Sequence, residues 1–456
     1  MQLRALLISS LLALSACAAP ETVSERRATY DLADLPTMRT FTANRVTRPA
    51  RSNVEIAQDF LDLSFTLESG RALPVLTRFE GPISVRVTGP VPVNLDTDLA
   101  RLLTRFRSEA GIDIARVPAN RQANITVEVV PRAQLQRAVP EAACFVVPRI
   151  RSWSEFTRNR RSDRIDWATL PTRKTLAVFI PGDVPPQEVR DCLHEELAQA
   201  LGPLNDLYRL TDSVFNDDNF HTVLTGFDML ILRATYAPEL RSGMNRDQVA
   251  AVLPRVLRRL NPAGAQRAPR VRPATTRAWI DEIEHALGPR TRMTQRRAAA
   301  RRAVIIARQG GWNDNRLAFS LFALGRLSLG DDPELALSSF LQAAGIYGSD
   351  PATQVHGAHI AMQLAAFALS SGQPQATLAI VDANTDAVIA AENAALLSTL
   401  LLVKSEALRS LDRGSEADRL RHEALGWARY GYGDTDEILR RAEEISAIAP
   451  RRGTGS

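Results

Sequence analysis

One short stretch of the chain carries several side chains that could do chemistry together. It reads EELAQALGPLND and covers residues 195–206. In a helix, residues four apart lie on one side, so Glu195 and Gln199 would point the same way, with the carboxylate of Glu196 beside them. Asn205 or Asp206 could return to the same point after the following turn. The stretch could therefore surround one metal ion, or Gln199 could donate a hydrogen bond to Glu195 in place of an ion.

The types of donor decide which ion such a group could hold. Catalytic zinc sites use mainly imidazole nitrogen, whereas carboxylate and amide oxygens suit Ca²⁺ or Mg²⁺. Three donors, of which one or two are neutral, would hold even these ions weakly. We therefore expect no bound cofactor, with zinc or calcium at these positions as the weaker alternative.

The histidines of the chain do not supply the missing imidazoles. His194 lies one residue early, and its spacing from Gln199 turns it away on a helix. His221 could approach from a loop, although nothing in the spacing requires it. His356 and His359 are three residues apart and could hold a metal, but such pairs are more often surface or packing residues.

The N-terminus has the pattern of a secretory signal, MQLRALLISSLLALSAC. Its apolar run is too short to cross a bilayer. Residues 14–17, Leu-Ser-Ala-Cys, resemble the lipobox of bacterial lipoproteins, in which the signal is cut before the Cys and the Cys carries lipid. The resemblance implies a signal peptide over residues 1–16 and membrane attachment through a lipidated Cys17; the alternative is an ordinary cleaved signal. Because Ala18 and not Asp follows the Cys, we expect the periplasmic face of the outer membrane.

The composition is that of a folded protein, since 45% of the 456 residues are hydrophobic and 23% are charged. After removal of the signal, this length suits two or three domains. The formal net charge is +5, and almost all the positive charge is arginine. We expect no nucleic-acid partner, because the chain is exported. A basic surface could attract anionic lipid or polysaccharide, or it could simply be solvated.

Two cysteines remain in the mature chain, Cys144 and Cys192. In an oxidising compartment a lone pair of cysteines usually forms a disulfide. Closing a loop of about 48 residues would stabilise the fold by about 4 kcal/mol in the chain-entropy account. Because Cys192 lies three residues before Glu195, this bond would fix the helix to the strand that carries Cys144. The alternative is two buried free thiols.

Between residues 73 and 203, stretches typical of strands alternate with stretches typical of helices. Apolar patterns predict strands over residues 82–89, 123–130, 143–150 and 174–182. Apolar residues at helical spacing predict helices over residues 54–67, 98–111 and from about 185 to a stop at Gly202. The order after residue 73 is strand, helix, strand, strand, strand, helix. This order predicts an α+β domain in which a helix crosses a mixed sheet.

The order is similar to that of the metzincin-like zincin metallopeptidases, whose active-site helix follows a sheet. Their motif H-E-x-x-H-x-x-G-x-x-(H/D) fits the EELAQALGPLND stretch in spacing. The resemblance places Glu195, Gln199 and Asn205 at the metal-ligand positions, with Asp206 as the neighbouring alternative. It makes Glu196 the general base. Every histidine of the motif is replaced, so the resemblance implies a frame that has lost its activity.

Two later stretches extend the resemblance. DSVFND, residues 212–217, resembles the S-[IV]-M-x-Y Met-turn of these enzymes, with Phe215 in place of Met. LTGFDMLILRATYAP, residues 224–238, resembles their closing helix. The same region looks closer still to an uncharacterised family of bacterial lipoproteins, known only as a domain of unknown function. That family carries this Glu-Glu-x-x-Gln helix and brings no known activity.

The rest of the chain is predicted to be helical and repetitive. Residues 263–277 are rich in Pro, Ala and Arg, which is typical of a linker. Beyond them a small–x3–large–x2–small pattern recurs after 40 and then 41 residues. Its members are Ala336, Phe340 and Ala343; Ala376, Ile380 and Ala383; and Ala417, Arg421 and Ala424. The pattern resembles tetratricopeptide repeats, which implies a solenoid that holds peptides or partner proteins; an irregular helical bundle is the alternative.

The sequence thus predicts an α+β zincin-like domain followed by an all-α helical-repeat solenoid. The expected order is a signal peptide (1–16), a lipid-anchored tether (17–53), the zincin-like domain (54–260), an Arg/Pro linker (261–277), the repeats (278–450) and a disordered tail (451–456). We expect a cell-envelope lipoprotein with an inactive zincin-like domain, whose repeats bind an unknown envelope protein or peptide. The alternatives are a metal-dependent peptidase or hydrolase of the periplasm that uses Glu195 and Glu196, or no relation to zincins.

Overall fold

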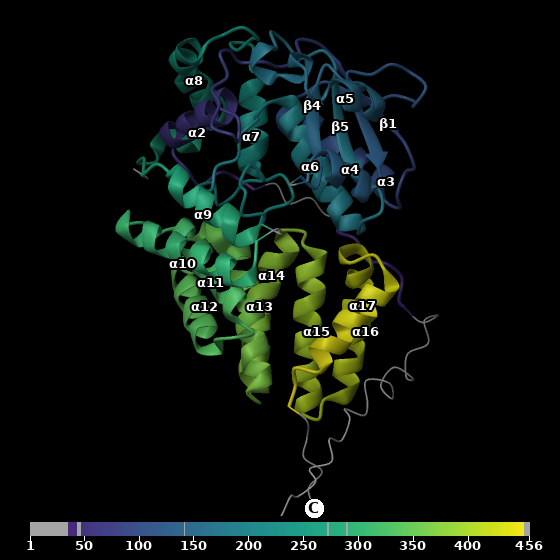
Figure 1. Cartoon of the computed structure of the whole chain (residues 1–456), viewed down its shortest axis with the longest axis vertical. Coiled ribbons are helices and arrows are strands. Elements are labelled where there is room, and N and C mark those ends of the chain that lie inside the picture. The colour runs from purple at the N-terminus through teal and green to yellow at the C-terminus, as the bar shows by residue number, and fades with distance from the viewer. Residues whose placement is uncertain (1–34, 43–46, 141, 271–272, 289–290, 451–456) are drawn as a thin grey trace, which may run out of the picture.

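The computed structural model describes residues 35–42, 47–140, 142–270, 273–288 and 291–450. The signal peptide, Cys17 with its expected lipid, and the tail over 451–456 lie outside the described residues. Figure 1 shows two stacked parts, which we name the α+β domain (residues 53–266) and the helical region (residues 277–446). Within the described ranges, no helix is long and apolar enough to cross a membrane.

A five-stranded sheet forms the centre of the α+β domain. Its strands are β1 (Ile83–Thr88), β2 (Ile114–Arg116), β3 (Ile125–Val130), β4 (Phe145–Pro148) and β5 (Leu176–Pro181), in the order β2-β1-β3-β5-β4. Neighbouring strands are parallel except β4, which runs antiparallel to β5 at one edge. The predicted mixed sheet is therefore confirmed, with an additional short strand, β2, that the sequence pattern did not indicate.

Side chains of the sheet alternate between a larger and a smaller core. All six residues of β5 are buried, with Val178 in the larger core and Phe179 in the smaller one. Helices α3 (Leu95–Ala110) and α6 (Pro186–Leu201) cover the larger core, and α4 (Arg132–Ala138) and α5 (Trp153–Asn159) cover the smaller one. Neither α4 nor α5 was predicted, because seven residues are too few for a helical period to stand out.

Three further helices complete the α+β domain: α2 (Asn53–Phe65), α7 (Gly226–Thr235) and α8 (Arg246–Leu260). A capping box begins α7, because the hydroxyl of Thr225 accepts from backbone N–H groups while the carboxylate of Asp228 accepts from the N–H of Thr225. These helices add to the larger core and hold the segment that joins α6 to α7.

The helical region contains successive helices that pack as antiparallel neighbours (Figure 1). They are α9 (Arg277–Leu287), α10 (Met293–Gln309), α11 (Asn315–Ser328), α12 (Pro333–Tyr347), α13 (Gln354–Ser370), α14 (Pro374–Ala390), α15 (Ala394–Ser410), α16 (Gly414–Gly431) and α17 (Thr435–Ser446). A Cβ atom at Gly325 would lie 2.6 Å from the ring of Phe340, so a small residue is required where α11 meets α12. The predicted helical, repeat-like character is confirmed.

The α+β domain and the helical region share packing. Phe220 and Tyr208, which follow α6, are buried in the core of the helical region. The ring centroid of Phe220 lies 5.4 Å from that of Phe322. A buried hydrogen bond of 2.8 Å also joins the hydroxyl of Tyr430 in α16 to the carboxylate of Asp98 in α3. The segment after α6 is thus a structural link between the two parts.

Part of the predicted tether lies against the helical region. The N–H of Arg39 donates to the carbonyl oxygen of Gly426 in α16 at 2.9 Å. Phe41 stacks on Trp427 with a centroid separation of 4.6 Å. The chain then reaches α7, where the N–H of Gly226 donates to the hydroxyl of Thr47 at 2.9 Å. Described residues before α2 therefore touch both parts of the molecule.

Replacing Phe220 by Ala should weaken the link between the two parts, because this ring is only 3% exposed. We expect the free energy of unfolding to fall by about 3–5 kcal/mol. We also expect calorimetry to resolve two thermal transitions where the wild-type chain shows one. Val54→Ala is the control, because Val54 is 66% exposed and its truncation should change the free energy by less than about 0.5 kcal/mol. An unchanged single transition in the Phe220 variant would contradict the proposed link.

Candidate functional site

Helix α6 carries an unusual number of buried polar side chains. Pro186 begins the helix, where its fixed φ suits the first turn, and Gly202 ends it. Twelve of its sixteen residues are buried, among them Glu196 and Gln199. Burying polar groups is costly unless they find partners or serve another purpose. The helix is therefore where a functional site is to be sought.

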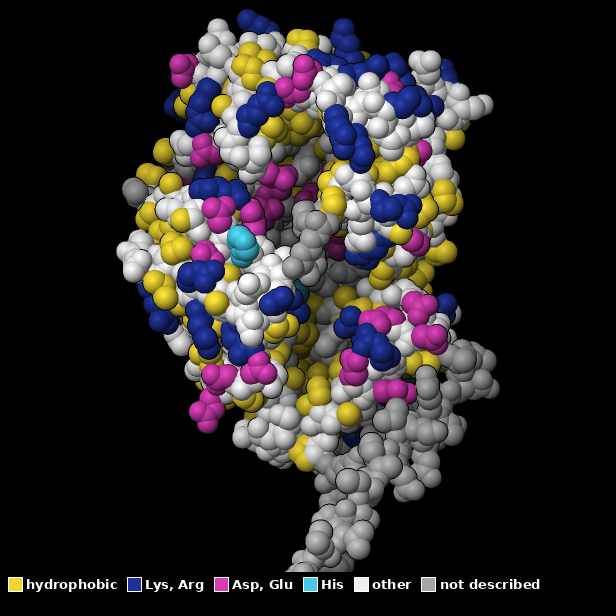
Figure 2. All heavy atoms as spheres, in the orientation of Figure 1, with side chains coloured by type: hydrophobic (Ala, Val, Ile, Leu, Met, Phe, Trp, Pro, Cys, Tyr) yellow, Lys and Arg dark blue, Asp and Glu magenta, His cyan; other side chains and the backbone are white. Residues whose placement is uncertain are grey.

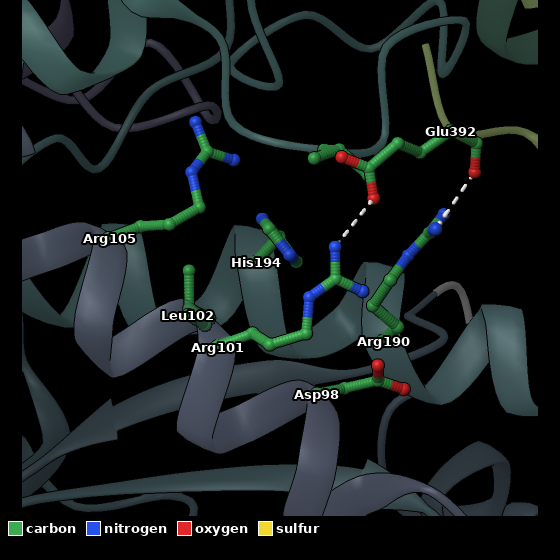
Figure 3. A pocket seen from close by; sticks show the side chains of 8 residues that line it. Asp98, Arg101, Leu102, Arg105, Arg190, His194 and Glu392 are labelled. Carbon is green, nitrogen blue, oxygen red and sulfur yellow. Dashed lines mark hydrogen bonds and ion pairs between the residues drawn. The ribbon is translucent and has the colours of Figure 1, made fainter. Parts of the chain in front are cut away.

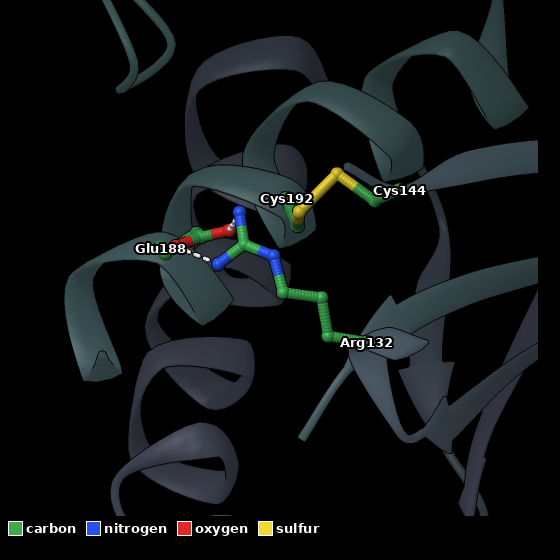
Figure 4. Close-up of a disulfide and its surroundings, with 4 residues drawn as sticks. All are labelled: Arg132, Cys144, Glu188 and Cys192. Atoms are coloured by element: carbon green, nitrogen blue, oxygen red, sulfur yellow. Dashed lines mark hydrogen bonds and ion pairs between the residues drawn. A yellow bond between two sulfur atoms is a disulfide. The ribbon is translucent and has the colours of Figure 1, made fainter. Parts of the chain in front are cut away.

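The two cysteines fix α6 to the start of β4 (Figure 4). Cys144 and Cys192 lie at disulfide distance, with an S–S separation of 2.08 Å and a Cα–Cα separation of 6.0 Å. An ion pair of 3.1 Å between Arg132 and Glu188 lies on the same side of the helix, as Figure 4 shows. Because Glu195 is one turn beyond Cys192, this connection brings it close to the edge of the sheet.

Carboxylates from three segments gather beside α6. We name them the acidic cluster: Glu68 from the turn after α2, Glu195 and Glu196 from α6, Asp206 from the residues after it, and Asp217 from the segment before α7. Figure 2 shows acidic side chains around a hollow at the level where the two parts meet. Among the described residues, no ion pair joins a member of the cluster to Lys, Arg or His.

Burial and mutual repulsion raise the pKa values of the acidic cluster. The pKa of Glu195 is raised to about 8, first by burial and then by the charges of Glu68 and Asp217. Burial and neighbouring carboxylates raise the pKa of Asp217 to about 7. The same causes raise the pKa values of Glu196 and Asp206 well above their ordinary values. Glu68 is exposed, yet the surrounding protein atoms still raise its pKa. Each carboxyl group therefore either keeps a proton or needs a cation.

A buried oxygen atom of Glu196 in the acidic cluster has no hydrogen-bond partner. Glu196 is only 4% exposed, and its Oε2 atom makes no hydrogen bond. A carboxylate oxygen of Glu195, one of Glu196 and the Sγ atom of Cys144 lie within 4.8 Å of one another. In the part of the chain that the structure describes, this is the one such group of three His, Cys, Asp or Glu residues. The disulfide removes the sulfur as a ligand, which leaves two adjacent carboxylates.

The remaining predicted ligand positions are only partly brought together. The side-chain amide of Asn205 donates to the carbonyl oxygen of Asp62 at 3.1 Å, so Asp206 reaches the cluster instead. Between described residues, no hydrogen bond joins Gln199 to Glu195. The side chain of Gln199 interacts with Glu68. Of the two alternatives left open for Gln199, the structure does not show the hydrogen bond to Glu195, because the amide is directed to Glu68.

The segment with Phe215 forms a buried turn fastened to α7. Phe215 itself is fully buried in the larger core. The hydroxyl of Ser213 donates to the carboxylate of Asp228, which also accepts from the N–H of Val214 at 3.2 Å. A turn of fixed shape thus lies between the acidic cluster and α7.

The histidines lie elsewhere. His194 accepts a hydrogen bond of 3.2 Å from the N–H of Leu224 through Nδ1, and burial lowers its pKa well below the ordinary value. The ring of His221 lies 5.7 Å from that of His356, which pairs with Asp218 at 3.0 Å. His221 therefore turns toward the helical region and not toward α6.

A small cavity marks another contact of α6 (Figure 3). It lies among α3, α6 and the turn between α14 and α15, with a volume of about 10 Å³. Arg190 donates to the carbonyl oxygen of Glu392 at 2.8 Å, and Arg101 pairs with its carboxylate at 3.5 Å. The space suffices for about one water molecule. We interpret it as a junction between the two parts and not as a ligand site.

Sequence reasoning missed two members of the acidic cluster, Glu68 and Asp217. Glu68 lies in a turn far from α6 along the chain, and Asp217 lies in the irregular segment that joins α6 to α7. Asp217 ends the DSVFND stretch, whose resemblance drew attention to Phe215 only. The sequence signal that could have found these two residues was the presence of acidic residues beside turns, in segments expected to pack near α6.

Replacing Glu195 by Gln should make the chelator-treated protein less sensitive to high pH. The folded chain raises the pKa of Glu195 from 4.5 to about 8, so it binds this proton more tightly than the unfolded chain does. The stabilisation is complete below pH 4.5 and is lost as the pH rises through about 8. At pH 8 the variant should exceed wild type in free energy of unfolding, on the order of 1–3 kcal/mol. Urea unfolding of both proteins, at pH 8 and at a pH below 4.5, measures this difference in free energy of unfolding. Equal stability of the two proteins at pH 8 would contradict the expected pKa of Glu195.

Comparison with known proteins gives one match. Residues 53–255 match the model of a family described as "Protein of unknown function (DUF2927)". No curated protein and no solved structure matches the chain. The matched residues run from the start of α2 into α8 and include the whole acidic cluster. The helical region lies outside the match, so this similarity concerns the α+β domain alone.

Proposed function

We propose that the chain is a cell-envelope lipoprotein whose α+β domain keeps a zincin-like frame without a zinc centre. In this proposal, the domain and the helical region bind other molecules and do not hydrolyse peptides. One observation carries it: the face of α6 that would hold zinc presents Glu195, Glu196 and Gln199, without any imidazole. Catalytic zinc sites rarely use more than one carboxylate.

The arrangement around α6 supports a retained frame. A helix that follows the sheet, the turn with Phe215 and the closing helix α7 occur in the order that the zincin resemblance implies. The hydrogen bonds of Asp228 to this turn keep its shape without any metal. The structural parts of a zincin-like frame can therefore persist after its catalytic activity is lost.

An open groove beside β4 supports a binding role. It has a volume of about 470 Å³ and is lined by both apolar and basic side chains. Among them are Phe145, Val146, Phe156, Arg160, Arg161 and Trp167. β4 is an edge strand, so one side of its backbone is not paired within the sheet. Edge strands of this kind can pair with an extended peptide.

The cellular setting remains part of the proposal. Export and lipidation at Cys17 would attach the protein to the periplasmic face of the outer membrane. An envelope protein or peptide is the proposed partner of the helical region, and no nucleic acid is expected there. Residues 35–42 lie on α16, so the anchored end of the chain would hold the helical region near the membrane.

The proximity of Glu195 and Glu196 favours a second candidate, a hydrolase. Their oxygens lie within 4.8 Å of each other, and the pKa of Glu195 is raised to about 8. Two adjacent carboxyl groups, when they share one proton, can act as general acid and general base. This candidate requires no zinc but does require that the loss of Glu196 abolish turnover.

Zinc content and hydrolysis together test the proposed function. Protein exported to the periplasm should contain no stoichiometric zinc, and Glu196→Gln should leave any peptide hydrolysis by the preparation unchanged. Glu188→Gln is the matched control, because Glu188 lies on the same helix outside the acidic cluster. Hydrolysis that falls by about 10²-fold or more only in the Glu196 variant would establish a hydrolase instead, and one zinc per chain would make it a zinc peptidase.

A further inference from the structure

We propose that the acidic cluster binds one hard divalent cation of the Ca²⁺ class, held by carboxylate oxygens from α6 and the two segments beside it. This inference rests on the proposed function in one respect, namely that the ligands on α6 are oxygen atoms and not imidazoles. It extends that function by naming the ligand of the site.

The first observation is that the carboxylates of the acidic cluster lie close to one another without a paired basic side chain among the described residues. Glu195 is repelled by Glu68, Asp217 and Asp191, and Asp206 is repelled by Asp217 and Glu195. The carboxyl groups of Glu68 and Asp206 also repel each other, but they are hydrogen-bonded and can share one proton. Only Asp217 has a basic group that lowers its pKa, and the effect of that group, Arg277, is its smallest. Arg277 is itself paired with Asp281 and Glu284.

Two other buried carboxylates of this chain have arginine partners, whereas the buried Asp228 is held by hydrogen bonds from a hydroxyl and backbone N–H groups. Asp59 pairs with Arg51 at 3.0 Å and with Arg209 at 2.9 Å. Glu109 pairs with Arg105 at 2.6 Å. The sequence contains 56 Lys and Arg residues, so basic partners are not scarce. Their absence from the described surroundings of the cluster indicates that something else supplies the positive charge.

The second observation is independent of charge counting. The Oε2 atom of Glu196 has no hydrogen-bond partner although this residue is only 4% exposed. The Oδ1 atom of Asp206 is likewise buried without a partner. A buried carboxylate oxygen without a donor is costly. A cation bound between these oxygens would remove that cost.

The donor set selects the ion. Five carboxylates and the side-chain oxygen of Gln199 are hard donors, and Ca²⁺ takes six to eight such oxygens in flexible geometry. Two oxygens on one Ca²⁺ ion, each about 2.4 Å from it, can be up to about 4.8 Å apart. The separation between the oxygens of Glu195 and Glu196 falls within that limit, whereas no third described carboxylate lies within it of both. In the proposal, Glu68, Asp206 and Asp217 therefore move closer to these two side chains when the ion binds. Mg²⁺ requires stricter octahedral geometry and prefers to keep its waters.

The supply of ligands from separate segments gives the ion a structural effect. α6 is held by the disulfide, whereas Glu68 lies on an exposed turn and can move toward the ion. Asp206 and Asp217 lie in the segment that carries Phe220 into the helical region. An ion held by these residues would therefore stabilise the segment that joins the acidic cluster to the contact between the two parts of the molecule.

Calorimetric titration of the full chain tests the proposal after chelator treatment. We expect one Ca²⁺ per chain, with Mg²⁺ bound at least about tenfold more weakly. Glu196→Gln should weaken Ca²⁺ binding by at least about tenfold, since it removes one ligand charge. Glu68→Gln should do the same, and because Glu68 is exposed this change does not endanger the fold. Glu188→Gln should bind as wild type does.

Several outcomes would overturn the inference. They are an absence of Ca²⁺ binding, binding that neither Glu196→Gln nor Glu68→Gln weakens, and a preference for Zn²⁺ over Ca²⁺. Absence of both ions from the site would remove this inference and leave the non-catalytic function intact. Bound zinc with Glu196-dependent hydrolysis would instead remove the proposed function.

Discussion

The rigid placement of α6 determines the rest of the site. The disulfide holds the middle of the helix to β4, and Arg190 holds its other side to the turn at Glu392. At the C-terminal end, the buried guanidinium of Arg173 donates to the carbonyl oxygens of Gln199 and Gly202, both at 2.5 Å. These carbonyls would otherwise lack partners at the end of a helix. With α6 fixed at these points, the backbone positions of Glu195 and Glu196 are fixed, so only side-chain rotation or protonation can relieve their repulsion.

The fixed position of α6 also connects the acidic cluster to the contact between the α+β domain and the helical region. The segment after α6 first supplies Asp206 and Asp217 to the acidic cluster and then inserts Phe220 among the aromatic rings of the helical region. A change in the charge of the cluster would therefore act on the contact between the two parts. The helical region thus packs against the segment that supplies part of the acidic cluster.

The sequence predicted the parts whose signals are local. Continuous apolar residues identified β5, and the small residues between long helices identified the repeat-like pairs. The pairing of Cys144 with Cys192 followed from the expectation that the chain is exported and has two cysteines after its signal. The sequence did not reveal Glu68, because an acidic residue in a turn has no local pattern that indicates burial or proximity to α6. Asn205 and Asp206 could not be told apart, since the backbone after Gly202 decides which side chain faces the cluster. The amide of Asn205 is used by α2.

The central claim is that α6 presents oxygen ligands for a hard cation and does not hold zinc. Diffraction from crystals grown with Ca²⁺ and Zn²⁺ together, with data collected on both sides of the zinc absorption edge, tests it most directly. The account predicts an ion bound to oxygens of Glu195, Glu196 and Asp206 that gives no anomalous signal specific to zinc. A zinc signal at this position, with Glu195 and Gln199 as ligands, would contradict it.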